Sequence, residues 1–457
     1  MLAKFLYKSY GFFYTLRLWR KRHFTPAGIM IMVAVFLSGL LGFNILKTNL
    51  YQVMALSFSI MGVSILLSLL PFKLKIKINR ILPEYATVDE KFTYELKITN
   101  LSSKTYKDLT LYENIHDPRP SFDNLISTKE PFEHTRNIWD KKTLYYRWQW
   151  LLHKNMKAFF LPVKLPDLPP DESIRVTAEF IPHCRGYIHF SGCTFARPDA
   201  IGLFNQLIEI KKSQKIVVLP KQYLFASPDL QPTRQYHPGG ISFASSIGDC
   251  DEFMSLRHYR PGDPLRNVHW RSFAKTNELV IKEFEDEHFV RHALILDTFL
   301  TSGNEALFEA GVSTASSYIT SMQTYESILD LMFVGNKIFS FPSGRGLAQP
   351  EKMLEIMACV EPCEDKTILE LLPLLESNIK TFSGSICIFL GWEQGHKKIY
   401  QLFKQARIPI FIIVLAHGES KADKLKIEEA VFQDINNFKV DIKVIHYKDI
   451  RQELGIA

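Results

Sequence analysis

The chain has 457 residues, 46% of them apolar, and a formal net charge of +7. This length allows two or three domains, each with its own core. The charge is unevenly placed, because residues 1–80 contain eleven Lys or Arg and no acidic residue. All 48 acidic residues lie in the remainder, where they outnumber the bases, and this argues against a protein that binds nucleic acid.

Two long uncharged stretches follow the basic N-terminus. Residues 27–46 and 50–70 are each about as long as the ~30 Å needed to cross a bilayer as a helix. Only Lys-Thr-Asn separates them, and basic residues crowd both outer flanks. The pattern predicts a two-helix transmembrane hairpin in the inner membrane within residues 1–80, with both termini cytoplasmic. The alternative is a soluble protein with two apolar core helices.

Alternating apolar residues mark the next region, residues 81–220. Residues 91–99 and 173–180 place every second apolar side chain on one face, as half-buried antiparallel strands do. The pattern favours an immunoglobulin-like β-sandwich.

An insertion at about 115–160 interrupts this alternation. It holds Trp139, Trp148 and Trp150 among several bases. Two interpretations stay open: a long insertion that packs on its own domain, or an aromatic belt lying on the inner leaflet.

Residues 221–292 connect the β domain to the last domain, and they contain the run RHYRPGDPLRNVHW at 257–270. Pro-Gly-Asp at 261–263 is a turn signal, and Trp270 offers a flat face for stacking. Planar guanidinium groups come from Arg257, Arg266 and Arg271. They suit carboxylates or phosphates, so an internal Asp–Arg lock and a docking surface for an acidic partner are the two leading interpretations.

Residues 293–457 carry continuous apolar runs separated by helical stretches. This is typical of a doubly wound α/β domain with a parallel sheet covered on both faces. Such sheets bind ligands at the carboxyl ends of their strands, and Asp297 follows the first strand.

Signatures of common enzymes are missing from the sequence. It has no phosphate-binding glycine loop, no dinucleotide fingerprint and no nucleophile elbow. Six cysteines are scattered without paired spacing, which indicates free thiols in a reducing compartment. The chain is therefore not expected to be an enzyme.

The segment 236–297 resembles the domain-of-unknown-function 58 family. Its matching residues are Arg257, Tyr259, Gly262, Asp263, Arg266, Trp270, Ala274, Lys275, Leu279, Val280, Lys282, Glu283, Phe284 and Glu285. Upstream, the resemblance extends to Arg185, Gly186, Asp199, Gly202, Leu203 and Phe204. Phe273 stands where a serine is usual, Lys275 where an arginine is usual, and Ala200 and Ile201 depart from the upstream pattern. The likeness covers nearly the whole chain except the insertion.

The resemblance implies a membrane protein whose last domain is similar to a von Willebrand factor A domain. It further implies an adaptor or scaffold that works with a MoxR-type AAA+ ATPase in protein assembly or envelope maturation. The residues expected to bind that partner, or to form a structural lock, are Arg257, Tyr259, Gly262, Asp263, Arg266, Trp270, Lys275, Glu283 and Glu285. No cofactor is expected, and no oligomeric state is indicated.

Von Willebrand A domains often carry a D-x-S-x-S metal site after their first strand, where this chain reads DTFLT. Asp297 and Thr301 offer oxygen ligands that suit Mg²⁺, whereas Phe299 replaces the first serine. A degenerate metal site, and with it a metal-dependent enzyme using Asp297, is therefore one alternative. Asp297 as a helix cap or as an acceptor of backbone hydrogen bonds is another. A purely structural membrane protein is the third function considered.

Overall fold

The computed structural model divides the chain into two compact units, Met1–Pro220 and Lys221–Ala457, which are described separately. The residues that the structure describes are 2–41, 50–70, 72–130, 133–225, 253–263, 265–284, 290–299, 305–322, 327–335, 337–343, 350–363, 366–416, 421–435 and 441–454.

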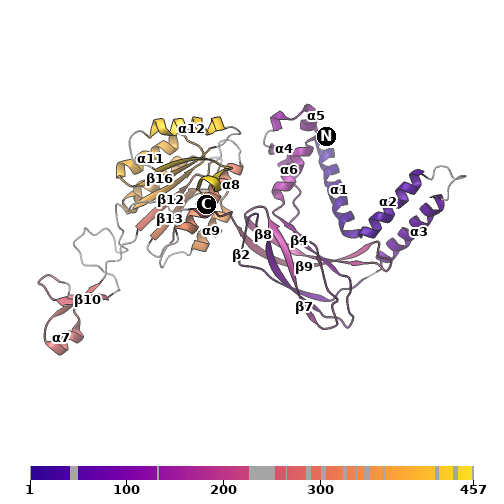
Figure 1. The fold of residues 1–457 in the computed structure, drawn as a ribbon, viewed down its shortest axis with the longest axis horizontal. Coiled ribbons are helices and arrows are strands. Elements are labelled where there is room, and N and C mark those ends of the chain that lie inside the picture. The colour runs from indigo at the N-terminus through magenta and orange to yellow at the C-terminus, as the bar shows by residue number, and fades with distance from the viewer. Residues whose placement is uncertain are drawn as a thin grey trace. The chain divides into compact units, whose positions relative to one another are not determined.

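The first unit begins with three helices, α1 (Leu2–His23), α2 (Pro26–Leu41) and α3 (Leu50–Ser68). The helix α1 is not foreseen in the sequence analysis, which treats this stretch only as a basic N-terminus. The helices α2 and α3 contact each other and lie side by side (Figure 1). By length and composition α3 could cross a membrane, whereas α2 has 16 described residues. The end of the predicted span 27–46 lies outside the described residues.

Two β-sheets follow. The first has the order β1 (Ile76–Ile81), β3 (Phe92–Asn100), β7 (Ser173–Pro182) and β5 (Ala158–Phe160). The second has the order β2 (Tyr85–Thr87), β9 (Asn205–Leu219), β8 (Gly186–Pro198), β4 (Thr110–Ile115) and β6 (Val163–Lys164). One hydrophobic cluster draws on both sheets, including Leu96 and Phe180 from the first and Phe190 from the second, so the sheets form a sandwich. The β domain starts at Ile76, five residues before the predicted boundary at 81, because β1 pairs with β3.

A charged pair lies inside this sandwich. Arg80 donates to the Glu113 carboxylate at 2.8–3.2 Å, and both side chains are almost fully buried. Tyr94 also donates to Glu113, at 2.8 Å, and the Arg80 guanidinium lies over the Phe190 ring. Burial, together with the nearby Glu113 charge, raises the pKa of the Cys193 thiol in this network to about 12.

The insertion is helical and packs on α1. It forms α4 (Phe122–Ser127), a short 3-10 helix (Glu133–Thr135), α5 (Ile138–Thr143) and α6 (Tyr145–Asn155). Trp148 is buried in a small cluster that includes Tyr10 and Tyr14 of α1, whereas Trp139 is 76% exposed. Packing is therefore observed for Trp148, but its partner is the N-terminal helix.

The turn between β8 and β9 contacts the apolar helices α2 and α3. Asp199 accepts backbone hydrogen bonds from residues 202–204 through Oδ1 and one from the Ser64 hydroxyl of α3 through Oδ2. The start of α2 touches the same turn, since Thr25 donates its amide to the Leu203 carbonyl at 3.1 Å. At Gly28 a Cβ atom would lie 2.2 Å from that carbonyl oxygen, so only glycine fits.

The second unit contains a small antiparallel segment. Its elements are β10 (Phe253–His258), a 3-10 helix (Leu265–Asn267), α7 (Trp270–Thr276) and β11 (Val280–Phe284). Val268 and Ile281 are buried between them.

The α/β domain has a six-stranded sheet in the order β14 (Ile338–Ser343), β13 (Ser327–Val334), β12 (Val290–Leu296), β15 (Gly384–Phe389), β16 (Ile410–Ala416) and β17 (Asp441–His446). All neighbours are parallel except β13 and β14. Its helices are α8 (Glu305–Ser321), α9 (Pro350–Cys359), 3-10 turns at Ile368–Leu371 and Ile379–Thr381, α10 (Leu372–Asn378), α11 (Gln394–Ala406), α12 (Lys421–Asp434) and α13 (Ile450–Leu454).

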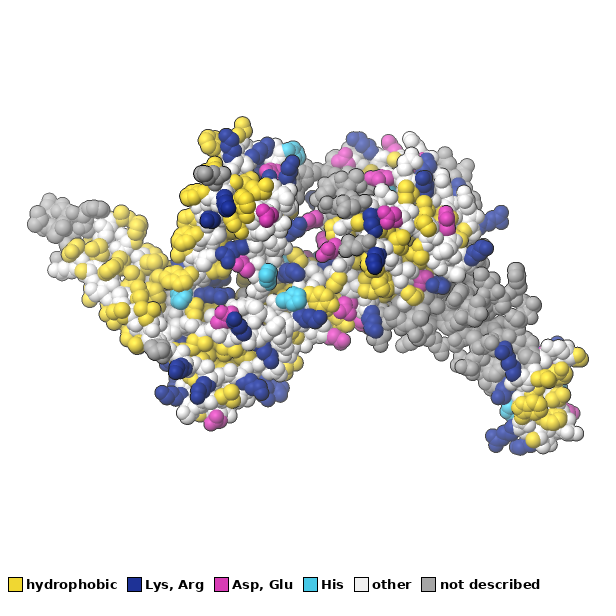
Figure 2. Space-filling model, turned by 180° about the vertical axis from the view of Figure 1, so that it is seen from behind, with side chains coloured by type: hydrophobic (Ala, Val, Ile, Leu, Met, Phe, Trp, Pro, Cys, Tyr) yellow, Lys and Arg dark blue, Asp and Glu magenta, His cyan; other side chains and the backbone are white. Residues whose placement is uncertain are grey.

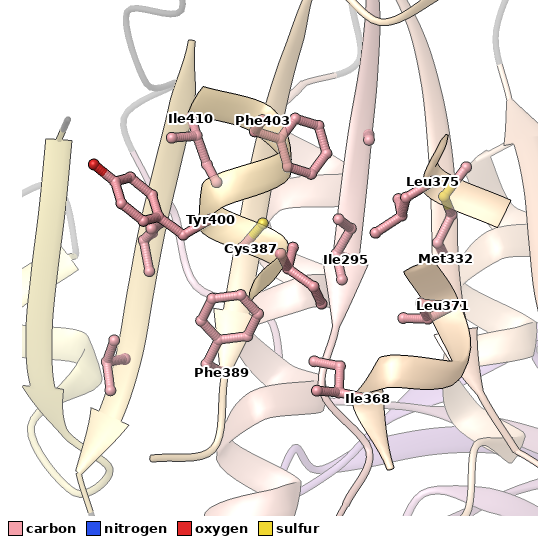
Figure 3. Packing of buried hydrophobic residues seen from close by; sticks show 14 of the residues in the cluster. Ile295, Met332, Ile368, Leu371, Leu375, Cys387, Phe389, Tyr400, Phe403 and Ile410 are labelled. Atoms are coloured by element: carbon pink, nitrogen blue, oxygen red, sulfur yellow. The ribbon is translucent and has the colours of Figure 1, made fainter. Parts of the chain in front are cut away.

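Helices cover both faces of this sheet, because successive strand residues point to opposite sides. Leu296 of β12 lies near Gly311 of α8. Its neighbour Ile295 belongs to the opposite core, with Phe403 of α11 and Leu375 of α10 (Figure 3). The continuous apolar runs of the sequence thus form strands buried on both faces.

Candidate functional site

The chain order reverses at the middle of the α/β sheet. From β12 the chain continues to β13 and β14 on one side, and then returns to β15 on the other side of β12. Ligands of such sheets bind outside the carboxyl ends of the strands at this reversal. Asp297 follows β12 and Leu390 follows β15, so both residues stand at that position.

Asp297 joins the two strand ends through hydrogen bonds. Its Oδ1 accepts from the Phe299 amide at 3.0 Å, and its Oδ2 accepts from the Leu390 amide at 2.9 Å. Nε2 of His396 lies 2.9 Å from the same Oδ2. The Asp297 side chain is only 2% exposed, so these donors replace water around the carboxylate.

The proton position on His396 follows from its second contact. The Glu393 amide donates to Nδ1 of His396 at 2.9 Å, so Nδ1 is an acceptor and Nε2 carries the hydrogen that points at Asp297. This contact is half of a capping box that starts α11. Both ring nitrogens are therefore engaged, and neither is available to take a substrate proton.

This donor set does not fit a metal ion at Asp297. A cation there would face two backbone N–H groups and the N–H of His396 in place of oxygen ligands. Among the described residues no cluster of three His, Cys, Asp or Glu could hold a metal. The suggestion of Mg²⁺ on Asp297 is thus not supported there, and Thr301 lies outside the described residues. Acceptance of backbone hydrogen bonds is what the structure shows for Asp297.

Aromatic and charged side chains lie next to His396, and we call them the His396 cover: Phe389, Trp392, Lys397 and Asp434. The Phe389 ring centroid is 4.4 Å from the His396 imidazole, and the Trp392 ring stacks on the same imidazole with centroids 6.2 Å apart. The Trp392 indole donates to Asp434 at 3.0 Å, and Lys397 pairs with the same carboxylate. The hydrogen bond from Lys397, and to a smaller extent the one from Trp392, lowers the pKa of Asp434. The cover was missed from sequence because its members come from three separate elements, although Gly-Trp directly after a strand marks where it begins.

The turn at residues 261–263 is fixed by a two-pronged ion pair. Arg257 contacts Asp263 through Nη1–Oδ2 at 2.6 Å and Nη2–Oδ1 at 2.8 Å. The Arg260 amide adds a bond of 2.8 Å to Oδ2. Hydrogen bonds from Arg257, and then from Arg260, lower the pKa of Asp263 to about 2. Gly262 has φ of +106°, which explains why glycine stands there.

We call this arrangement the Arg257–Asp263 lock. It connects the end of β10 to the turn that follows, within one short segment. Tyr259 joins the same segment to its second strand, since its amide donates to the Leu279 carbonyl at 2.9 Å. The backbone of Glu283 pairs with Ser255, whereas Glu285 lies outside the described residues.

Beyond the lock, the segment presents an apolar surface edged with bases, which we call the Trp270 surface. Trp270 is 61% exposed and Leu265 is 62% exposed. The neighbouring side chains of Arg266, Arg271 and Lys275 are exposed as well. Figure 2 shows hydrophobic side chains gathered on one face of this segment with Lys and Arg beside them.

Comparison with known proteins points to the same region. The sequence model of the family described as "Protein of unknown function DUF58" matches residues 255–373, which include the lock and Asp297. The uncharacterized protein YeaD of Bacillus subtilis (strain 168) is 26% identical over 176 residues. This alignment covers 38% of the chain and 42% of YeaD, so it spans less than half of that relative.

Two of the solved structures that resemble this chain are distant likenesses. A crystal structure of the CARDB domain of a Pyrococcus furiosus protein with di-metal ions has 12% identity, covers 34% of this chain and 96% of that chain, and has a TM-score of 0.17. Proximal thread matrix protein 1 from the mussel byssus has 11% identity, covers 36% and 43%, and has a TM-score of 0.27. Scores this low carry no conclusion about fold or function.

Proposed function

We propose that this chain is a membrane-anchored adaptor that works with a MoxR-type AAA+ ATPase in protein assembly or envelope maturation. In this proposal α2 and α3 form a two-helix hairpin in the inner membrane, with both termini in the cytoplasm. The β-sandwich is then immunoglobulin-like and the α/β domain von Willebrand A-like. The apolar composition of both helices and the basic residues outside them support the anchor.

The observation that carries the adaptor function is the Trp270 surface. Tryptophan and arginine are the residues most often found at the centres of protein interfaces, where a few side chains supply most of the binding energy. Here an exposed tryptophan and leucine lie beside exposed bases, on a segment whose turn is fixed by the lock. A rigid apolar patch with a positive edge suits an acidic protein partner.

The buried Asp297 favours an adaptor over an enzyme. Its carboxylate is consumed by internal donors, and the imidazole beside it has both nitrogens bonded. A metal-dependent enzyme built on Asp297 therefore gains no support from this geometry.

The test is a pull-down of the full chain from native membranes in detergent, with and without a non-hydrolysable ATP analogue, read by mass spectrometry. We expect an AAA+ ATPase to be retained with nucleotide. Trp270→Ala should reduce its recovery by about tenfold or more, as expected for a hot-spot residue. Phe432→Ala, which removes an equally exposed aromatic residue on α12, is the matched control and should leave recovery unchanged.

Two results would contradict the proposal. If no ATPase is retained in either nucleotide state, the partnership fails and a purely structural membrane protein is the better account. If Trp270→Ala and Phe432→Ala behave alike while an ATPase is retained, the docking surface lies elsewhere on the chain.

A further inference from the structure

The helix α1 has one side that is committed to the insertion. Tyr7 donates its hydroxyl to the Pro120 carbonyl at 3.0 Å, and Tyr10 donates to the Thr143 carbonyl at 2.9 Å. Tyr14 lies seven residues after Tyr7, which is two helical turns, and its ring meets Trp148 edge-on. The insertion therefore holds α1 along this tyrosine side and fixes its rotation about its own axis.

The other side of α1 is apolar and open. Its members are Leu2, Phe5, Phe12, Phe13, Leu16 and Trp19, all exposed. At about 100° per residue, Phe5, Phe12 and Leu16 project within about 40° of one another, nearly opposite the tyrosines. The Phe12 side chain, for example, is 63% exposed. A row of this kind is too large and too regular to be the scattered apolar residues of an ordinary surface.

Positive charge borders this row on both sides. By the same helical spacing, Lys8 lies at one edge of the row and Arg17 at the other. Arg20, Lys21 and Arg22 fill the last turn of α1. No acidic residue occurs anywhere in residues 1–80. This charge pattern complements an anionic lipid surface, because each Lys or Arg near such a surface adds attraction.

The open side also continues into the apolar helices. Figure 1 shows α1 between the insertion helices on one side and the α2–α3 pair on the other, with a sharp turn before α2. At that turn a pocket of about 410 Å³ is lined by Trp19 of α1, Leu69 and Leu70 after α3, and Phe204 of the β8–β9 turn. The apolar row of α1 thus leads directly to the ends of the helices assigned to the membrane.

We propose that α1 lies in the plane of an anionic membrane surface, with its Phe5–Phe12–Leu16 side buried at the boundary between headgroups and acyl chains. The inference rests on the proposed membrane anchor and adds a second contact to it. A helix with an apolar side and flanking bases binds membranes in this way. The insertion is then carried by α1 at the membrane surface, through the tyrosine side.

The experiment places p-benzoylphenylalanine at single positions of the full chain, reconstituted in vesicles of phosphatidylcholine with phosphatidylglycerol. After illumination, lipid adducts are measured by mass spectrometry. Phe12→p-benzoylphenylalanine should give several-fold more lipid adduct than Lys4→p-benzoylphenylalanine, which is exposed but lies off the apolar row. Leu56→p-benzoylphenylalanine, on an exposed site of α3, reports the anchor itself.

The outcomes separate the two ideas. Lipid adducts at positions 12 and 56 with little at position 4 support both the in-plane helix and the anchor. Adducts at 56 with no excess at 12 over 4, or with protein adducts only at 12, overturn the in-plane helix and leave the anchor standing. Absence of lipid adducts at all three positions overturns both. Vesicles of phosphatidylcholine alone should lower the adduct at position 12 several-fold, because the anionic attraction is removed.

Discussion

Asp297 and His396 lie 99 residues apart in the chain, yet a hydrogen bond of 2.9 Å joins the Asp297 carboxylate to Nε2 of His396. The bond closes the carboxyl edge of the sheet where β12 meets β15. In related architectures this edge is where a ligand enters. Here the Asp297 carboxylate at this edge is already occupied by His396 and two backbone amides.

Removing this carboxylate should weaken the α/β domain. Asp297→Ala leaves the Leu390 amide and the His396 ring without an acceptor in a buried position, and the Phe299 amide in a partly buried one. We expect a loss of about 3 kcal/mol, since each unmet buried donor costs about 1–3 kcal/mol. Hydrogen exchange of peptides from β12 and β15 measures the change in local opening free energy.

Asp449→Ala, at an exposed carboxylate near the C-terminus, is the control and should change exchange little. Wild-type exchange should also be insensitive to Mg²⁺. Protection of β12 by Mg²⁺ would instead show that Asp297 binds the ion.

The lock should fail in acid and not in base. Because the pKa of Asp263 is lowered to about 2, the folded segment favours the ionised carboxylate, whose unfolded pKa is about 3.9. The stabilisation is therefore fully present above pH of about 4 and disappears as the pH falls toward 2. Carbon-13 NMR of aspartate-labelled protein measures this titration directly.

Arg257→Gln should move the Asp263 titration back toward the ordinary range, because the guanidinium that lowers this pKa most is lost. Arg266→Gln changes an exposed neighbour outside the lock and should leave it in place. An Asp263 titration near pH 4 in the unmodified protein would contradict the observed pair.

Breaking the buried Arg80–Glu113 pair should destabilise the sandwich strongly, whereas replacing both side chains by apolar ones should not. Arg80→Ala leaves Glu113 charged and buried, and we expect a loss of about 3–5 kcal/mol. The double variant Arg80→Met with Glu113→Leu removes both charges and should recover most of that loss. Alkylation of the buried Cys193 at increasing urea concentration measures the free energy of unfolding of the sandwich alone.

Arg175→Ala removes an exposed partner of Glu95 and should cost less than about 1 kcal/mol. A double variant as unstable as Arg80→Ala would mean that the hydrogen bonds of Tyr94 and Cys193 to this network matter more than the charges do.

Gly28→Ala should loosen the junction between α2 and the β domain. The added Cβ would lie 2.2 Å from the Leu203 carbonyl oxygen, so α2 or the turn must move. We expect faster proteolysis after residue 204 in detergent. Gly62→Ala on α3 is the matched control, because nothing lies within 4 Å of its added Cβ. Equal proteolysis of the two variants would show that the contact carries no stability.

The sequence predicts the central strands β12, β13, β15 and β16 well, because each carries a long apolar run buried on both faces and can be identified without knowledge of its neighbours. It also places Asp297 at a strand end. It does not predict that His396 fills the site, since that depends on α11 starting beside β12, and the chain order does not reveal which strands become neighbours. The edge strand β14 was missed for a similar reason, as its antiparallel pairing interrupts the expected alternation of strand and helix.

The helix α1 was missed for a different reason. Six of its 22 residues are Lys or Arg and they indicate only a basic N-terminus, whereas the role of its tyrosines depends on the insertion that lies against them. The same dependence explains why Trp148 and Trp139 could not be told apart, since one is buried and the other 76% exposed within ten residues.

The bond between Ser64 and Asp199 spans 135 residues, and this has a consequence for how the chain is made. During synthesis α2 and α3 leave the ribosome long before the turn that holds them exists. During that interval α2 and α3 must be held by something other than the β8–β9 turn. The Ser64–Asp199 bond can form only after β8 and the turn between β8 and β9 have been synthesised. We therefore expect loss of Asp199 to lower the expression yield more than it lowers the stability of the folded protein.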